Sequence, residues 1–208
     1  MSRIFRIDGL SETQLSQVSA QIDEGAVAAF ATDTVYGIGA QAFAEESIAR
    51  IYQIKGRPAQ VPLQILIGSV AQAKEIVEWG ENADKLARAF WPGGLTLVLP
   101  ANEKGSPLLR SFTGLGLRLP AHPSLVRLLL RMKNPLASTS ANLHGAPVIT
   151  REEDLLQFLE TKADIILLGG TLSSVASSVV DLTACPRILR EGAVSRLALE
   201  KTLGFGVK

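Results

Sequence analysis

Ala137-Ser138-Thr139-Ser140-Ala141-Asn142 is the stretch around which this chain is organised, because it places three hydroxyls and a carboxamide directly after the apolar residues 135–137. An apolar segment that passes into a Ser/Thr/Asn cluster is typical of a chain that leaves a buried strand and presents polar groups at its end. In open α/β sheets, ligands bind at such strand ends. A serine-rich turn without a ligand explains the same residues, so the rest of the chain has to distinguish the two.

The composition is that of an ordinary globular protein. The chain has 208 residues, of which 47% are hydrophobic and 20% charged, and its formal net charge is +1. This charge gives no overall electrostatic argument for nucleic acid, although it allows a local basic patch. One cysteine, Cys185, and two histidines, His122 and His144, cannot form an internal disulfide or a multi-ligand Cys/His metal site. We therefore predict no metal held by protein side chains.

Residues 1–8 mix apolar and charged side chains and lack the apolar centre of a signal peptide. No stretch approaches the ~20 apolar residues that span a membrane. We expect a soluble, cytoplasmic protein without a membrane partner.

Apolar runs alternate with helical periodicities along the chain, which predicts an α/β fold. The expected strands are 26–31, 61–67, 95–99, 114–120, 164–170, 179–182 and 187–192, besides the segment before Ser138. The expected helices are 12–24, 45–55, 70–79, 83–90, 125–132, 151–159 and 194–203. Several strands are adjacent and bounded by proline. This favours a twisted, open mixed (parallel and antiparallel) sheet with flanking helices, in a single domain over residues 1–208 with its core at roughly 11–192.

Two stretches have the spacing of a capping box, in which a Ser or Thr side chain and a Glu or Gln side chain satisfy each other's backbone amides. They are Ser11-Glu12-Thr13-Gln14 and Thr150-Arg151-Glu152-Glu153. The second predicts Thr150 as the N-cap of a helix. Lys55-Gly56-Arg57-Pro58 has the composition of a helix end. The same segment also fixes two cations at the end of a rigid element, and Arg57 lies beyond the glycine that ends the helix.

The segment after the first expected strand, Thr32-Asp33-Thr34-Val35-Tyr36-Gly37-Ile38-Gly39, brings hydroxyls and a carboxylate to a strand end. We expect its glycines to let the backbone come close to a ligand. Gly37, Gly39 and Ala42 match the spacing of a dinucleotide fingerprint. However, the glycines do not directly follow the strand, and no acidic residue stands about 20 positions further on, so we do not predict that site.

Four cations stand at element ends with few carboxylates beside them, namely Lys55, Arg57, Arg118 and Arg190. Arg118 lies within an otherwise apolar strand, where a charge is costly unless it is paired, so it serves either a structural ion pair or a ligand. Arg binds carboxylate or phosphate with two parallel bonds, and Lys supplies a compact charge. The set predicts an anionic ligand. There is no P-loop and no persuasive Ser/His/Asp or Cys/His nucleophile set, so chemistry would rest on positioning and charge stabilisation, as in nucleotidyl transfer.

Together these motifs, in this order, resemble the threonylcarbamoyl-AMP synthases of the YrdC-like family in their short, single-domain form. The resemblance covers roughly residues 11–192. The motifs are Thr32-Asp33-Thr34-Val35-Tyr36-Gly37, Lys55-Gly56-Arg57-Pro58 with Pro62-Leu63, Trp91-Pro92-Gly93, Leu117-Arg118-Leu119-Pro120 with His122-Pro123, Ser138-Thr139-Ser140-Ala141-Asn142, and Ser178-Val179-Val180-Asp181 with Ile188-Leu189-Arg190. The chain ends where short members end, which predicts that it lacks the additional C-terminal domain of the long ones.

The resemblance implies a YrdC-like fold and the synthesis of threonylcarbamoyl-AMP and pyrophosphate from L-threonine, bicarbonate and ATP, for threonylcarbamoyladenosine modification of tRNA. It implies that threonine is held by Thr34, Arg118, Ser140 and Ser177, with Arg118 pairing the carboxylate. It implies that ATP, accompanied by Mg²⁺, is contacted by Arg57, Asn142, Thr150 and Arg190. Lys55 and Arg57 would be the catalytic cations, with Lys55 against the phosphates or the carbamate. The implied downstream partners are the proteins that transfer the threonylcarbamoyl group to tRNA.

Four positions depart from the pattern of the family. Val61, Leu66 and Gly114 replace polar residues of the ATP and threonine pockets, and Glu191 replaces a proline. We interpret these as differences between subfamilies. Two alternatives remain: a tRNA- or double-stranded-RNA-binding protein of the same fold, and a paralogue with another carbamoyl or adenylate substrate. For the RNA alternative the sequence offers scattered Arg and Lys residues without interleaved aromatics.

Within the opening stretch, the resemblance singles out two residues. Ser140 and Asn142 are two positions apart, so both side chains point to the same side if the chain there is extended. We expect them to form one wall of an anion-binding pocket. Ser138 and Thr139 are expected to give structural support.

Overall fold

The computed structural model describes residues 2–58, 60–109, 112–173 and 175–207. Its strands form one sheet in the order β1-β8-β2-β3-β7-β4-β6-β5-β9-β10. The strands are β1 (Arg3–Arg6), β2 (Ala28–Phe30), β3 (Gly37–Gln41), β4 (Gln64–Leu66), β5 (Leu95–Leu99), β6 (Leu115–Arg118), β7 (Leu136–Ser140), β8 (Ile165–Leu168), β9 (Ser178–Asp181) and β10 (Arg187–Arg190). Parallel pairs (β1/β8, β2/β8, β4/β6, β5/β9) occur beside antiparallel ones, which confirms the predicted mixed sheet.

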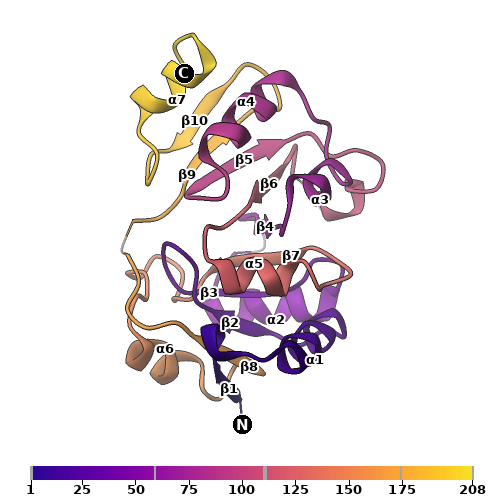
Figure 1. The fold of residues 1–208 in the computed structure, drawn as a ribbon, viewed down its shortest axis with the longest axis vertical. Coiled ribbons are helices and arrows are strands. Elements are labelled where there is room, and N and C mark those ends of the chain that lie inside the picture. The colour runs from indigo at the N-terminus through magenta and orange to yellow at the C-terminus, as the bar shows by residue number, and fades with distance from the viewer. Residues whose placement is uncertain (1, 59, 110–111, 174, 208) are drawn as a thin grey trace.

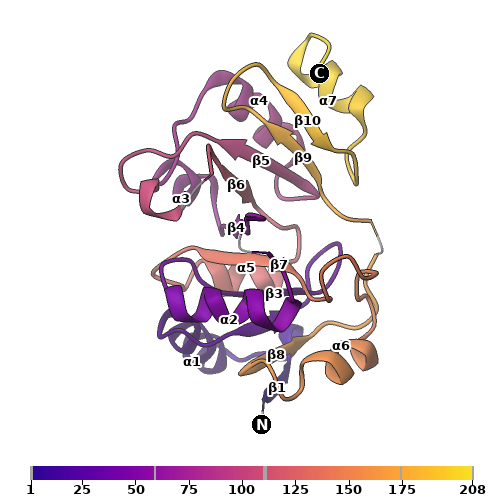
Figure 2. The ribbon, with the colours of Figure 1, turned by 180° about the vertical axis from the view of Figure 1, so that it is seen from behind.

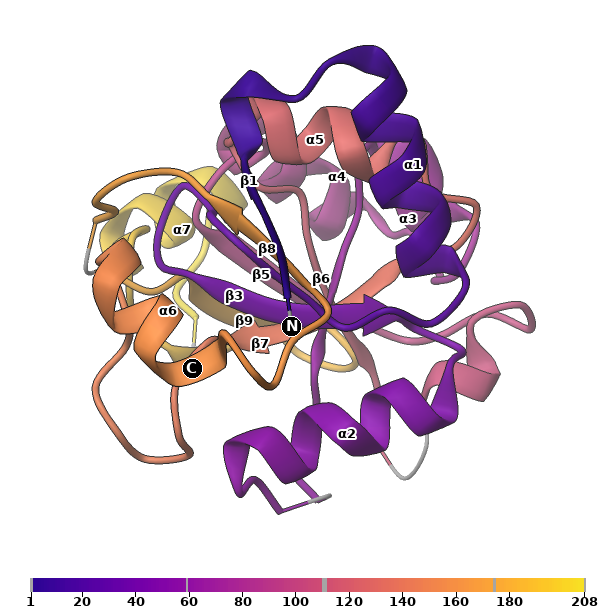
Figure 3. The ribbon, with the colours of Figure 1, turned by 90° about the horizontal axis from the view of Figure 1, so that it is seen from below.

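The helices lie on both faces of this sheet. They are α1 (Glu12–Asp23), α2 (Glu45–Lys55), α3 (Val70–Lys74), α4 (Glu81–Phe90), α5 (Pro123–Leu129), α6 (Glu152–Leu159) and α7 (Arg196–Leu203), with short 3-10 turns at Ile7–Gly9 and Ser106–Leu108. The strand order follows the long axis of the molecule, from β1 near the N-terminus to β10 near the C-terminus (Figure 1). Helix α5 covers one face and α2 the other, as the view from behind (Figure 2) and the view from below (Figure 3) agree.

Apolar periodicity explains where the helices pack. In α2, Ile48 and Ile51 are buried, and in α5 Leu125, Leu128 and Leu129 are buried. Spacing of three and four residues puts these side chains on one stripe of each helix, facing the sheet. Strand β2, which lies between β8 and β3, is buried along its whole length, as the apolar run at this point predicts.

Two predicted helix boundaries are confirmed by their caps. Ser11 and Gln14 form the complete capping box at the start of α1. Helix α2 spans Glu45–Lys55 as predicted, and Gly56 follows it in the left-handed conformation with φ of 56°. A residue without Cβ adopts that conformation at no steric cost, so the glycine ends the helix and turns Arg57 away from its axis.

The prediction for the glycines of residues 32–39 is wrong. Gly37 and Gly39 lie within β3, a strand that the sequence did not predict. A Cβ on Gly37 would lie 2.7 Å from Cε2 of Phe30, and a Cβ on Gly39 would lie 2.6 Å from the carbonyl oxygen of Ala137. The space beside these glycines is filled by the protein itself, so they allow close strand packing and not the approach of a ligand.

Other boundaries also differ. The helix expected over 70–79 ends at Lys74, and Val77 instead forms an isolated bridge with Ala101. The second capping box is absent: Arg151 is the N-cap of α6 and no side chain caps it, so Thr150 is not the cap. Strand β7 continues through Ser140, so the hydroxyls expected after the strand belong to it. For Val77 and for the end of β7, pairing with a distant segment overrides the local pattern.

A candidate anion-binding cavity

A cavity of about 490 Å³ lies along one part of the sheet. This volume lies within the range of small-molecule sites. Six neighbouring strands, β7, β4, β6, β5, β9 and β10, contribute side chains to its wall. The polar residues of the wall are Thr34, Arg57, Gln64, Thr96, Thr113, Arg118, Ser138, Thr139, Ser140, Ser177, Asp181, Arg187 and Arg190.

The charge of the wall is strongly positive. Arg57, Arg118, Arg187 and Arg190 line it, whereas Asp181 is the acidic residue among the described lining residues. Both oxygens of Asp181 are already engaged, one by the backbone amide and hydroxyl of Thr183 and the other by Arg187 at 3.3 Å. The cavity therefore suits a ligand with negative charge, as the isolated cations of the sequence predicted.

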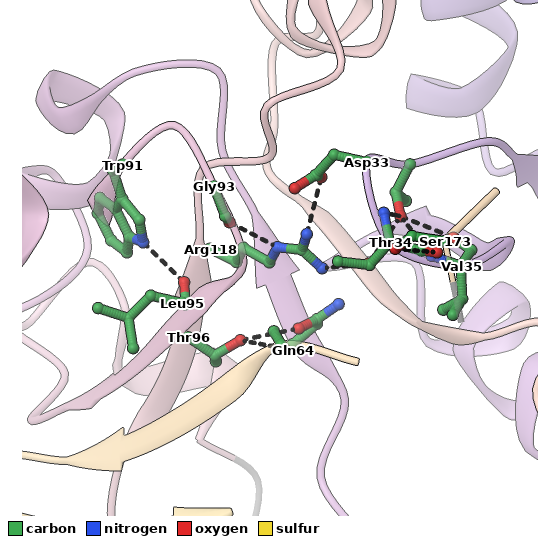
Figure 4. A network of polar contacts seen from close by, with 12 residues as sticks. Asp33, Thr34, Val35, Gln64, Trp91, Gly93, Leu95, Thr96, Arg118 and Ser173 are labelled. Carbon is green, nitrogen blue, oxygen red and sulfur yellow. Dashed lines mark hydrogen bonds and ion pairs between the residues drawn. The ribbon is translucent and has the colours of Figure 1, made fainter. Parts of the chain in front are cut away.

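Arg118 is the most deeply buried of these cations, with 3% of its surface exposed. Figure 4 shows its guanidinium between Gly93, Asp33 and Thr34. It donates from Nε to the carbonyl of Gly93 (3.0 Å), from Nη1 to Oγ1 of Thr34 (2.9 Å) and from Nη2 to Oδ1 of Asp33 (2.7 Å). Burial lowers the pKa of Arg118, and Asp33 opposes that shift. The sequence left a structural ion pair and a ligand site as alternatives; the residue both forms an ion pair and lines the cavity.

The position of Thr34 is set by a turn around Thr32. The hydroxyl of Thr32 accepts hydrogen bonds from the backbone amides of Thr34 (3.1 Å) and Val35 (3.2 Å) and donates to the carbonyl of Val35 (2.6 Å). Ser173 donates to the carbonyl of Thr34 from the loop before β9. Local turn chemistry of this kind explains why the hydroxyl of Thr34 reaches Arg118 and the cavity.

Arg57 is held at the cavity mouth by the segment that follows it. Its guanidinium donates to the carbonyls of Pro62 (2.8 Å) and Val61 (3.3 Å), and Nη1 lies 3.5 Å from the hydroxyl of Thr139. Partial burial lowers the pKa of Arg57. The end of helix α2 thus places a cation on the cavity wall, since Arg57 follows the left-handed Gly56.

Lys55 lies beneath the turn that follows β7 and is 1% exposed. Its ammonium donates to the carbonyls of Ser140 (2.5 Å) and Asn142 (2.6 Å), and lies 3.3 Å from Oδ1 of Asn142. Burial, and secondly the charge of Arg57, lower the pKa of Lys55 to about 8. The lysine therefore braces the Ser140–Asn142 turn from inside the protein.

Ser140 and Asn142 are joined directly, because the hydroxyl of Ser140 donates to Oδ1 of Asn142 at 2.5 Å. The amide nitrogen of Asn142 donates to the carbonyl oxygens of Ala146 (2.6 Å) and Leu143 (3.0 Å), and so closes the loop 142–146. Ser140 lines the cavity, whereas Asn142 is not among its described lining residues.

The structure brings six of the predicted site residues together on the cavity wall. These are Thr34, Arg57, Arg118, Ser140, Ser177 and Arg190. Lys55, Asn142 and Thr150 are outside the lining set; the first two contact Ser140, and Thr150 follows the lining residue Val148 by two positions. Ser138 and Thr139, expected as support, line the cavity as well.

Sequence reasoning missed five polar lining residues, Gln64, Thr96, Thr113, Asp181 and Arg187. Gln64 and Thr96 are single polar residues within apolar strands, which is the signal that singled out Arg118 and could have singled them out too. Among the departures from the family pattern, Val61 and Gly114 line the cavity, whereas Leu66 is buried outside it and Glu191 pairs with Arg196.

Fold and site together define an α/β protein with a twisted mixed sheet and an arginine-lined cavity of the size of a small-molecule site. Residues 20–192 match the family model Sua5, YciO and YrdC, whose description is "Telomere recombination". The chain belongs to this family. No helix in the described residues has the length and apolar character needed to cross a membrane.

Curated relatives share this sequence over most of its length. The chain is 39% identical to the threonylcarbamoyl-AMP synthase of Pyrococcus abyssi, over 94% of this chain and 58% of that protein. It is 34% identical to the synthase of Bacillus subtilis, over 93% of this chain and 58% of that protein. A putative threonylcarbamoyl-AMP synthase of Mycobacterium tuberculosis H37Rv is 37% identical over 88% of this chain and 86% of that protein. The chain thus spans little more than half of the first two relatives.

Solved structures confirm the predicted YrdC-like fold. The crystal structure of Pyrococcus abyssi Sua5 complexed with L-threonine has a TM-score of 0.89 and 35% identity, and matches 100% of this chain and 62% of that one. Escherichia coli YciO has a TM-score of 0.87 and 25% identity, with 96% and 100% of the two chains covered.

Proposed function

We propose that this chain is a threonylcarbamoyl-AMP synthase that uses L-threonine, bicarbonate and ATP. The observation that carries the proposal is the cavity in which the buried Arg118 meets hydroxyl side chains and further arginines. The named relatives, and the relative that was crystallised with L-threonine, support the choice of substrate. RNA binding as the main function has no comparable support from a cavity or from the names of these relatives.

The threonine carboxylate is proposed to bind Arg118. A guanidinium has five N–H groups, and three of them bind Gly93, Thr34 and Asp33, which leaves two for a carboxylate. Because Asp33 offsets the charge of Arg118 in part, substrate can leave as well as bind. The hydroxyls of Thr34, Ser140 and Ser177 are proposed to contact the remaining polar atoms of threonine.

ATP is proposed to enter with Mg²⁺ from the more exposed side of the cavity, where Arg57 and Arg190 lie. The donor chemistry fits an ion held largely by the phosphates, because the carboxylate of Asp181 in the wall already has three hydrogen-bonding partners. Direct contacts of Asn142 and Thr150 with ATP remain predictions. A contact of Lys55 with phosphate or carbamate also remains a prediction, and it requires that the ammonium leave one of its carbonyl partners.

In the proposed reaction, the amine of threonine is carboxylated by bicarbonate with loss of water. A carbamate oxygen then attacks the α-phosphorus of ATP, a P–O bond forms, and the bond from the α-phosphorus to the bridging oxygen breaks to release pyrophosphate. Negative charge grows on the phosphates as that bond breaks. Arg57, with its guanidinium fixed by two backbone carbonyls, is placed to stabilise this charge without reorganisation.

The decisive experiment measures pyrophosphate release by the purified chain with ATP, Mg²⁺, bicarbonate and L-threonine. We expect release that requires both threonine and bicarbonate, and a product that hydrolyses to threonine, AMP and bicarbonate. Parallel reactions replace threonine by serine, valine or another amino acid. Release that depends on a different amino acid would identify a paralogue with another substrate, and no amino-acid-dependent release would refute the proposal. Transfer to tRNA by partner proteins is tested separately, by adding tRNA and a transfer complex.

A further inference from the structure

A chain of hydrogen bonds runs along the cavity wall through four side chains. Nη2 of Arg190 donates to Oγ of Ser177 (3.2 Å), Oγ of Ser177 lies 3.0 Å from Oγ1 of Thr96, and Oγ1 of Thr96 lies 3.2 Å from Oε1 of Gln64. Thr96 and Ser177 are each 3% exposed. Figure 4 shows the link between Thr96 and Gln64 beside Arg118.

The arrangement of strands in the sheet makes this series of hydrogen bonds possible. Gln64 lies on β4 and Thr96 on β5, and β6 separates these strands. Ile65 pairs with Leu117 and Val98 pairs with Gly116, so the side chains of Gln64 and Thr96 share a face on which β6 presents Gly116. Because Gly116 has no side chain, Gln64 can reach Thr96 across the intervening strand.

The donor-to-acceptor direction of these hydrogen bonds follows from the chemistry of the groups at the two ends of the series. A guanidinium only donates and a carboxamide oxygen only accepts. The hydrogen of Thr96 is therefore given to Gln64, so Thr96 must accept from Ser177. The amide of Gln64 is oriented by its other end, because Nε2 lies 3.5 Å from the hydroxyl of the buried Ser138, its partner across β4 and β7.

What remains on Ser177 is one lone pair. A hydroxyl has one hydrogen and two lone pairs; the hydrogen binds Thr96 and one lone pair binds Arg190. A carboxylate or phosphate oxygen at this position would meet a lone pair and would be repelled. A hydroxyl or N–H group of a ligand would find an acceptor.

We propose that Gln64 and Thr96 are positioning residues that hold Ser177 as a hydrogen-bond acceptor, so that a donor group of the amino-acid substrate, its hydroxyl or its N–H, binds there while its carboxylate binds Arg118. This inference rests on the proposed function, because it takes the ligand to be an amino acid. It names the residues that orient the substrate, and neither Gln64 nor Thr96 has to touch it.

The test is calorimetric titration with two amino acids, L-threonine and L-2-aminobutyrate, which lacks the hydroxyl. Gln64→Leu removes the acceptor of the Thr96 hydroxyl, so Thr96 can donate to Ser177 and the direction of that hydrogen bond reverses. Thr96→Val removes the group that accepts the hydrogen of Ser177. We expect each to weaken threonine binding by about tenfold, the loss typical of one misdirected buried hydrogen bond. Thr96→Ser keeps the acceptor and should restore the affinity.

The two ligands identify the donor. A loss confined to threonine would show that the hydroxyl binds Ser177, and an equal loss for both would show that the N–H does; either supports the proposal. The proposal would be overturned if folded Gln64→Leu and Thr96→Val both kept their affinity for both ligands. It would also be overturned if Thr96→Ser lost as much affinity as Thr96→Val.

A second measurement needs no ligand and no variant protein. In the wild-type protein, NMR cross-relaxation from the side-chain amide protons of Gln64 should reach Ser138 and not Thr96. Strong cross-relaxation to Thr96 would show that the amide of Gln64 has the opposite orientation, and this would refute the proposed direction of the hydrogen bonds. If the wild-type protein bound no amino acid, the proposed function would fail, and the NMR result would still decide whether Ser177 is held as an acceptor.

Discussion

At the scale of single residues, the buried cations carry the chemistry of the cavity. Arg118 and Lys55 are similarly buried but have different surroundings: Arg118 has a carboxylate partner in Asp33, whereas Lys55 has backbone carbonyls and the amide oxygen of Asn142. A charge that is buried without an opposite charge loses more of its hydration energy than it regains, so the two residues are expected to respond differently to mutation and to pH.

Arg118→Ala should abolish most threonine binding. A lost charge-assisted pair costs about 1.5–3 kcal/mol, which corresponds to roughly ten- to a hundredfold in the dissociation constant. Arg118→Lys should not rescue binding, because an ammonium cannot form the parallel pair of bonds. Titration calorimetry measures the effect, with Arg88→Ala as the matched control, since the side chain of Arg88 is 81% exposed on α4. Retained threonine affinity in Arg118→Ala would contradict the assigned role.

Lys55 should make folding stability depend on pH in an unusual direction. Its pKa is about 8 in the folded protein and 10.5 for an ordinary lysine. Between these pH values the unfolded chain binds a proton that the folded protein has released, so the contribution of Lys55 to the free energy of unfolding rises with pH.

The measurement is urea unfolding of the wild-type protein and of Lys55→Met at a series of pH values from about 8 to about 10.5. We expect the difference in free energy of unfolding to change in favour of the wild-type protein as the pH rises. A difference that is constant with pH would mean that Lys55 keeps its charge in the folded protein.

At the scale of elements, the pairing of β3 with β2 and β7 fixes the positions of the site residues. Strand β3 begins three residues after Thr34, and β7 carries Ser140. Gly37 pairs with Ser140 and Gly39 with Ser138 across this ladder. A change that separates these strands should therefore disturb both walls of the cavity at once.

Gly39→Ala should destabilise the fold by about 1–3 kcal/mol, the usual cost of forcing an extra carbon into a packed interior. The added Cβ would lie 2.6 Å from a backbone carbonyl oxygen, which cannot move aside as a flexible side chain can. Gly206→Ala is the matched control, because the nearest atom to a Cβ at that position is Oε1 of Glu200, 4.0 Å away. Thermal unfolding compares the two, and equal melting temperatures would show that β3 and β7 tolerate separation.

At the scale of the whole molecule, the cavity is lined by segments that are far apart in the sequence. The segment between β2 and β3 contributes Thr34, whereas Ser177, just before β9, and Arg190, at the end of β10, come from the C-terminal part of the chain. The positive charge of the wall is graded, because Arg118 is buried whereas Arg187 and Arg190 are exposed. Since exposed charges are screened by salt and buried charges much less, two anionic groups bound in this cavity should respond differently to ionic strength.

ATP affinity should fall clearly between about 0.05 M and about 0.5 M NaCl, because the Debye length shortens and the exposed arginines are screened. Threonine affinity should change little, since its proposed partner Arg118 is shielded from solvent. Titration of each ligand at both salt concentrations measures the effect. Equal salt dependence for the two ligands would argue that threonine also binds at the exposed end.

The sequence by itself determined the alternation of strands and helices, the mixed sheet, the end of α2 at Gly56 and the cationic residues of the site. These follow from periodicity, capping chemistry and the cost of burying an unpaired charge, all of which act over a few residues. It also predicted Ser140, which lines the cavity.

Only the tertiary structure decided which residues from distant parts of the sequence pack against each other and form hydrogen bonds. It placed Phe30 beside Gly37, put Lys55 beneath the turn after β7, and joined Gln64 to Thr96 across Gly116. Such contacts depend on which strands become neighbours in the sheet. Strand order and register are set by the packing of the whole chain, so a local sequence pattern does not predict them.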